Sequence, residues 1–91
     1  MTIAITHDRV ARKFTASVDG VDGYVEYESG DGRMVITHTV VPSEIGGRGI
    51  AGQLVKEALD FARSEGLKVV PECSYAADYL DKHLEYANLV A

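Results

Sequence analysis

Four glycines within seven residues, between a predicted strand and a predicted helix, constrain the fold of this chain more than any other feature. The glycines are Gly46, Gly47, Gly49 and Gly52. Residues 34–41 have the composition of a β-strand, and residues 50–64 place apolar side chains at the spacing of an amphipathic helix. Glycines at such a junction leave backbone N–H groups uncovered at the positive end of the helix dipole. The segment therefore predicts a binding site for a phosphate-bearing ligand.

The residues before this segment predict an antiparallel meander. Residues 14–18 and 24–28 alternate apolar with polar side chains, and residues 33–41 form a third strand-like run. Turns are predicted between them at Asp19-Gly20, Asp22-Gly23 and Gly30-Asp31-Gly32. Short turns between successive strands favour antiparallel pairing. Residues 3–5 predict a short first strand.

The residues after the glycine segment predict a single βαβ crossover. Residues 67–70 are a further strand-like run, which the helix at 50–64 connects to the strand at 33–41. A right-handed crossover makes these two strands parallel. Residues 76–83 predict a second, shorter helix. The fold class is therefore α/β (α+β), with one mixed sheet that combines the N-terminal meander and the crossover.

Length and composition limit what the chain can be. Its 91 residues predict one domain over residues 1–91, and a 46% hydrophobic content is typical of a globular protein. The net charge of −5 argues against nucleic acid as a partner, which needs a basic face. No apolar run approaches the roughly 20 residues that span a membrane. A single cysteine, Cys73, forms no internal disulfide, and a cytoplasmic location is predicted.

Two familiar phosphate motifs do not explain the glycines. Residues 47–52 match the dinucleotide-binding pattern G-x-G-x-x-G, and Glu72 follows about 20 residues later. However, residues 42–46 separate the first glycine from the strand, and the chain has one crossover where a dinucleotide needs two mononucleotide halves. A P-loop is excluded because no Gly-Lys-Ser/Thr follows the glycines. A third interpretation needs no ligand, because glycines can simply let a helix pack close to a sheet.

Four further motifs occur in order along most of the chain. They are His38-Thr39-Val40-Val41-Pro42, Arg48-Gly49-Ile50-Ala51, Val70-Pro71-Glu72-Cys73 and His83-Leu84-Glu85-Tyr86. In these motifs the chain resembles the GNAT superfamily of acetyl-CoA-dependent N-acetyltransferases, and within it a subgroup of very short, domain-minimal proteins. Residues 46–51 cover the family's Arg/Gln-x-x-Gly-x-Gly/Ala loop, with Gly46 where Arg or Gln is usual. The resemblance implies a GNAT-like fold without the helices that shape the acceptor pocket in larger relatives.

The resemblance also implies a cofactor and a reaction. The cofactor is acetyl-CoA (CoA), whose acetyl group is transferred to a primary amine acceptor. The implied cofactor-binding residues are Thr39, Val40 and Val41 for the pantetheine arm, and Gly46, Gly47, Arg48, Gly49, Ile50 and Ala51 for the pyrophosphate. The alternative function is a CoA-binding or protein-interaction module that catalyses no reaction.

Cys73 is the first candidate catalytic residue, because the resemblance places the thioester near the end of the second parallel strand. Its thiol could take the acetyl group before passing it on. It could equally be a small apolar residue at a strand-to-helix junction. Glu72 and Asp78 would raise the pKa of the thiol, whereas a helix N-terminus near Ala76 would lower it.

His38 is the second candidate, because imidazole exchanges protons near neutral pH and could act as the general base. The alternation of the strand places it on one face with Met34, Ile36 and Val40, so a packed core histidine is the alternative. Tyr75 and Tyr79 are candidate acids or anchors of the second helix. His83, Glu85 and Tyr86 are predicted to dock the tail. No metal site is predicted, because His7, His38, His83 and Cys73 share no ligand spacing.

Overall fold

The computed structural model describes residues 3–91, which form a five-stranded sheet with helices beside it. The strands are β1 (Ile5–Asp8), β2 (Lys13–Val18), β3 (Val21–Gly30), β4 (Arg33–Val40) and β5 (Lys68–Pro71). They lie in sequence order, antiparallel from β1 to β4 and parallel between β4 and β5. The predicted mixed sheet is confirmed. The first strand lies at Ile5–Asp8, so its predicted position at 3–5 is wrong.

Two-residue turns connect the long strands. Asp19 and Gly20 join β2 to β3 with φ of 53° and 77°, and Asp31 and Gly32 join β3 to β4 with φ of 52° and 74°. Two successive positive φ angles match the right-handed twist of the flanking strands, and Asp-Gly is well suited to them. The turn predicted at Asp22-Gly23 is wrong, because these residues lie inside β3 and pair with β2.

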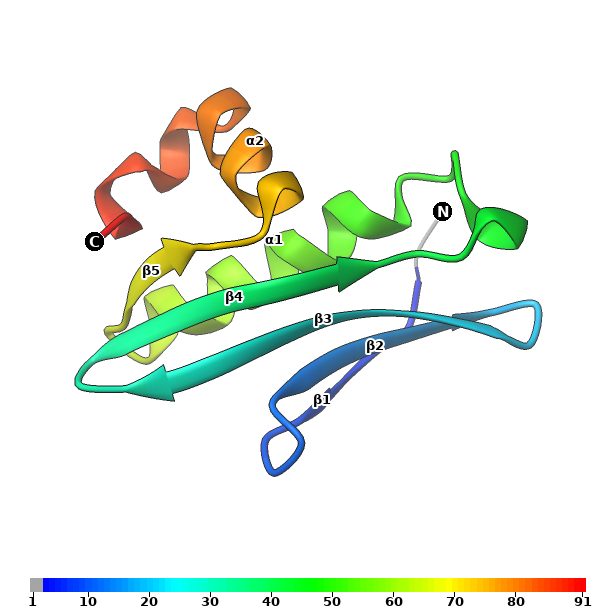
Figure 1. The fold of residues 1–91 in the computed structure, drawn as a ribbon, viewed down its shortest axis with the longest axis horizontal. Helices are drawn as coiled ribbons and strands as arrows, with labels where there is room; N and C mark the ends of the chain where they lie inside the picture. Colours follow the sequence, from blue (N-terminus) through cyan, green and yellow to red (C-terminus); the bar gives the residue numbers. More distant parts are fainter. Residues whose placement is uncertain (1–2) are drawn as a thin grey trace.

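Helix α1 (Ile50–Ser64) has the predicted bounds and lies behind the sheet in Figure 1. Its apolar stripe is fully buried at Leu54, Val55, Ala58 and Leu59. These side chains meet buried residues of the sheet, which come from alternate positions of the strands because side chains on a strand point to opposite faces. The strand residues in this core are Phe14, Ala16, Val25, Tyr27, Met34, Ile36 and Val69.

Two further helical segments complete the described chain. Helix α2 (Ser74–Lys82) and the 3-10 helix η2 (Leu84–Leu89) pack against α1 beside the β5 edge of the sheet (Figure 1). The predicted second helix is confirmed but begins two residues earlier, at Ser74. Within residues 3–91, no helix covers the sheet face opposite α1, which carries Tyr24, Glu26 and Glu28.

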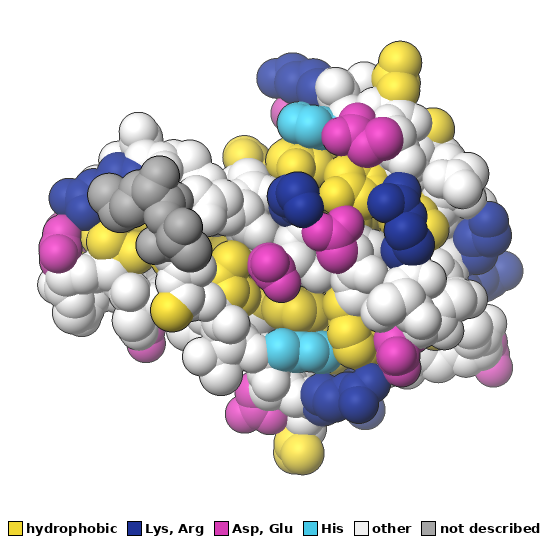
Figure 2. Space-filling model, turned by 180° about the vertical axis from the view of Figure 1, so that it is seen from behind, with side chains coloured by type: hydrophobic (Ala, Val, Ile, Leu, Met, Phe, Trp, Pro, Cys, Tyr) yellow, Lys and Arg dark blue, Asp and Glu magenta, His cyan; other side chains and the backbone are white. Residues whose placement is uncertain are grey.

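On the side that carries α1, side chains of both charges are interspersed with apolar ones (Figure 2). None of the described helices combines the length and the apolar composition needed to cross a lipid bilayer.

Candidate functional site

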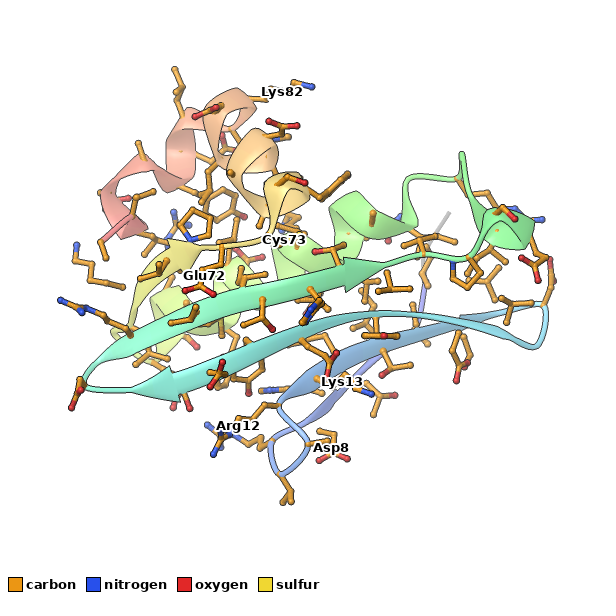
Figure 3. All side chains as sticks on the ribbon, in the orientation of Figure 1. Asp8, Arg12, Lys13, Glu72, Cys73 and Lys82 are labelled. Atoms are coloured by element: carbon orange, nitrogen blue, oxygen red, sulfur yellow. The ribbon has the colours of Figure 1, made fainter. Side chains whose placement is uncertain are left out.

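The strands β4 and β5 stay paired for only part of the length of β4. Their register runs from Arg33↔Lys68 to Ile36↔Pro71. The next two backbone N–H groups, of Glu72 and Cys73, both donate to the carbonyl oxygen of Ile36, at 3.1 and 3.0 Å. The chain then turns into α2, whereas β4 continues to Val40 (Figure 3). Residues 38–40 of β4 therefore pair with β3 on one side, and residues 37–40 have an edge without a β5 partner on the other, here called the free edge.

A β-bulge lies where this pairing ends. The register between β3 and β4 shifts from Tyr27↔Ile36 to Glu26↔His38, so Thr37 is one extra residue on β4. An extra residue reverses which face each later side chain occupies. After the bulge, Thr39 pairs with Val25 on the α1 face and His38 pairs with Glu26 on the open face.

The register also identifies which backbone groups face the free edge. The N–H of Tyr27 donates to the carbonyl oxygen of Arg12, on the β2 side of β3. Backbone groups alternate along a strand, so Glu26 and Tyr24 direct theirs toward β4, where their partners are His38 and Val40. Thr39, between these two partners, directs its N–H and C=O away from β3. Thr39 therefore presents its backbone to the gap between β4 and β5.

The glycine loop forms the far end of this gap. After a 3-10 turn (η1, Ser43–Ile45), Gly47 and Gly49 adopt φ of 76° and 74°, and α1 begins at Ile50. A Cβ atom on either glycine would meet nothing within 4 Å, so the left-handed backbone, and not close packing, explains them. The packing interpretation is therefore wrong for this pair. Gly49 is the N-cap of α1 and supplies no side-chain hydrogen bond, so the first N–H groups of the helix remain uncapped.

Arg48 reaches from the loop to the β2–β3 turn. Its guanidinium donates to Oδ2 of Asp19 at 2.8 Å, and 44% of the Arg48 side chain is exposed. Both segments lie at the same end of the molecule, on the right in Figure 1. No local pattern indicates this contact, because the partners are 29 residues apart. The contact with Asp19 holds the Arg48 guanidinium beside the uncapped N-terminus of α1.

Cys73 lies at the other end of the free edge, two residues after β5 and at the N-cap of α2 (Figure 3). Its thiol is partly buried and donates to Oγ1 of Thr39 at 3.3 Å. Burial raises the pKa of the Cys73 thiol, but Thr39 Oγ1 and the backbone N–H groups of Ala76, Tyr75 and Thr39 outweigh burial, so the net pKa is lowered. Glu72 and Asp78 were expected to raise the pKa of the Cys73 thiol. The N–H groups at the start of α2 and the hydrogen bonds from Thr39 lower it instead.

His38 lies on the opposite face of β4 from Cys73. It is exposed, its Nδ1 is 3.2 Å from Oγ1 of Thr37, and it is 3.9 Å from the Glu26 carboxylate. The prediction that it shares a face with Met34 and Ile36 is wrong, because the bulge intervenes, and so is the alternative of a packed core histidine. His38 and Cys73 flank the free edge from two sides and do not form a Cys–His pair.

A cavity of about 350 Å³ opens between α1 and α2. Its lining residues are Gly52, Tyr75, Asp78, Tyr79, Lys82 and His83. The ring of His83 stacks on Tyr79 with centroids 3.8 Å apart, which fixes one wall. Gly52 faces α2, since a Cβ there would be in van der Waals contact with the Tyr75 hydroxyl at 3.4 Å. Sequence reasoning missed Gly52 and Lys82 as neighbours of a cavity, because only the packing of two helices brings them together.

Tyr86 docks the C-terminal segment, as predicted. Its hydroxyl donates to Oδ1 of Asp60 at 2.7 Å, and the Arg63 guanidinium lies 4.8 Å from its ring centroid. Burial, followed by the hydrogen bond to Asp60, raises the pKa of Tyr86 to about 12. The hydroxyl therefore stays protonated at neutral pH and holds η2 against α1.

The geometry can be compared with known proteins. Residues 13–89 match the family model of the GCN5-related N-acetyl-transferases. The chain belongs to this family. The family generally uses acetyl-CoA, and the short GNAT-like architecture predicted from the motifs is confirmed.

Similar proteins of this family support the assignment. Protein NATD1 from Gallus gallus is 39% identical over 84 residues, covering 89% of this chain and 76% of the relative. NATD1 from Homo sapiens is also 39% identical over 84 residues, covering 89% and 74%. The NMR solution structure of a GCN5-like protein from Staphylococcus aureus superposes with a TM-score of 0.76 at 28% identity, covering 97% of this chain and 87% of that chain.

Proposed function

We propose that this protein binds acetyl-CoA along the free edge of β4 and transfers its acetyl group to a primary amine. The free edge carries the proposal, because it connects Cys73 directly with the uncapped N-terminus of α1. An extended pantetheine arm needs backbone partners of this kind, and a pyrophosphate needs N–H donors at a helix N-terminus. Both requirements are met within one continuous segment, residues 37–50.

The residues present fit the cofactor in three places. The loop residues Gly46, Gly47, Arg48, Gly49, Ile50 and Ala51 would hold the pyrophosphate. The register supports Thr39 as a backbone partner of the arm, while the backbone of Val40 already pairs with Tyr24. The cavity between α1 and α2 would accept the adenosine end, where Lys82 supplies a cation for a phosphate.

Bound acetyl-CoA would supply an acetyl group activated as a thioester. In the covalent form of the proposal, the Cys73 thiolate would form a new C–S bond to the acetyl carbon as the C–S bond to CoA breaks, and CoA would leave as its thiolate with that electron pair. The amine acceptor then attacks the acetylated Cys73, whose thiolate leaves. In the direct form of the proposal, the amine would attack the thioester of bound acetyl-CoA from the open face of β4, and His38 on that face would take the proton that the amine loses.

The alternative is a CoA-binding module without turnover. It is favoured by the open sheet face, which has no helix among residues 3–91 to shape an acceptor pocket. An assay that measures binding and transfer separately distinguishes the two functions.

Native mass spectrometry of the protein with acetyl-CoA, CoA or NAD tests the proposal. We expect adducts with both CoA species and none with NAD. Arg48→Ala should weaken them, while Arg12→Ala, in the β1–β2 turn, serves as the matched control (Figure 3). Absence of CoA adducts at high micromolar ligand would refute the proposal. Acetyl retained at Cys73 would support the covalent form, whereas full transfer by Cys73→Ala would exclude it; CoA binding without transfer to any amine would indicate the binding module.

A further inference from the structure

The Cys73 thiol meets one side-chain hydroxyl, that of Thr39. Sγ donates to Thr39 Oγ1 at 3.3 Å, in a partly buried contact between residues 34 positions apart. Nothing in the sequence indicates this pairing, because uninterrupted alternation would direct His38 and not Thr39 toward the α1 face. The bulge at Thr37 reverses the order. The contact is therefore a consequence of one extra residue in β4.

A hydroxyl suits both protonation states of a thiol. It carries one hydrogen and two lone pairs, so it accepts from the neutral S–H and can turn to donate to a thiolate. Hydrogen bonds to an ionised partner are roughly twice as strong as those between neutral groups. The Thr39 hydroxyl therefore favours the thiolate, in the same direction as the N–H groups at the start of α2.

We propose that the Thr39 hydroxyl is a positioning residue for Cys73, holding the sulfur against the free edge of β4 and stabilising its thiolate. The inference rests on the covalent form of the proposed function and adds the group that prepares the nucleophile. It also gives Thr39 two separate tasks. The backbone C=O faces the gap, and the side chain, together with the backbone N–H, acts on the sulfur at the border of that gap.

No positively charged side chain among residues 3–91 is a cause of the lowered pKa of Cys73, so hydrogen-bond dipoles lower it. On β4, His38 lies on the other face. Glu72 precedes the cysteine and is exposed, and α2 contributes Tyr75 and Asp78, which are both exposed. Within residues 3–91, Cys73 has no Lys or Arg among the causes of its lowered pKa. The groups that lower the pKa of the Cys73 thiol are therefore hydrogen-bond partners, and the Thr39 hydroxyl is the first among them.

Alkylation by iodoacetamide across pH 6 to 10 tests the proposal, since Cys73 is the single cysteine and reports alone. Thr39→Val removes the hydroxyl at similar volume, and Thr39→Ser keeps it. Loss of the hydroxyl should raise the pKa of the thiol, and the smaller thiolate fraction is only partly offset by the greater intrinsic nucleophilicity of the thiolate, so Thr39→Val should react about threefold more slowly near pH 7. Near pH 10, where ionisation is no longer limiting, it should react faster than the wild type. Thr39→Ser should follow the wild-type profile.

The crossing of the two profiles separates this role from a structural one, which would change rates in one direction at every pH. Superimposable profiles for Thr39→Val and the wild type would overturn the proposal, and so would equal changes in Thr39→Val and Thr39→Ser. If the valine variant does not fold by circular dichroism, Thr39→Ala replaces it in the same comparison. The alkylation rates need no CoA, so a failure of the proposed function would appear separately, as missing CoA adducts in native mass spectrometry.

Discussion

The ion pair between Arg48 and Asp19 predicts that removing the Asp19 carboxylate strengthens CoA binding. The guanidinium is held at 2.8 Å by a turn that belongs to a different part of the chain. A phosphate at the N-terminus of α1 would compete with Asp19 for this guanidinium. Asp19→Asn removes the competing charge while keeping the size of the side chain, and asparagine tolerates the positive φ of 53° at this position.

The exposure of the two side chains determines the magnitude. Asp19 is 72% exposed and Arg48 is 44% exposed, so the pair contributes about 0.2–1 kcal/mol, as surface ion pairs do. Since 1.4 kcal/mol corresponds to a tenfold change, Asp19→Asn should lower the Kd for CoA by about 1.5- to 5-fold. Arg48→Ala removes a charge-assisted hydrogen bond of about 1.5–3 kcal/mol and should raise the Kd by about 10- to 100-fold.

Isothermal titration calorimetry of CoA into the wild type, both single variants and the double variant measures these effects. The gain from Asp19→Asn should shrink between about 0.05 and 1 M salt, because the Debye length falls to about 3 Å. Asp31→Asn is the matched control, since Asp31 occupies the corresponding turn position with φ of 52°. The reasoning fails if Asp19→Asn binds CoA no more tightly than the wild type, or if its gain persists undiminished in the Arg48→Ala background.

Two further predictions concern stability. Gly49→Ala forces a side chain into the left-handed region at φ of 74° and should cost about 1–2 kcal/mol, lowering Tm by several degrees in differential scanning calorimetry. Gly30→Ala, with an ordinary φ and open space around it, should lower Tm less; equal losses would count against strain at Gly49. Burial, and then Arg9, lowers the pKa of His7, so its neutral form stabilises the fold above pH 6.5 and this contribution is lost as the pH falls. Tm should therefore decline between pH 7.5 and 5 more steeply in the wild type than in His7→Phe, and parallel slopes would contradict the assignment.

The elements that the sequence predicted well are those with strong local signals. Helix α1 has a long apolar stripe, and a glycine lies close to each of its ends. Its bounds at Ile50–Ser64 therefore follow from residues in the helix and next to it. The start of α2 and the position of β1 depend on partners instead. β1 pairs with β2 over Ile5↔Ala16 to Asp8↔Lys13, a register that a four-residue strand does not encode by itself.

The motifs located the candidate site along the chain, but not which side chains meet in it. Cys73 and the glycine loop were predicted as parts of one site, and the structure places them at the two ends of the free edge of β4. The partners Thr39 and Asp19 emerged only from the structure. Each contact spans about 30 residues, and each depends on backbone geometry that alternating polarity does not reveal.

The bulge at Thr37 explains why one strand serves both the core and the candidate site. Up to Ile36, β4 pairs on both sides and its alternate side chains are buried. From Thr37 onward it pairs on one side alone, because β5 turns away into α2. A bulge bends and twists the strand that carries it, which lets β4 diverge from β5 at this point. The same extra residue reverses the faces of His38 and Thr39, so the geometry that opens the gap also determines which hydroxyl meets the thiol.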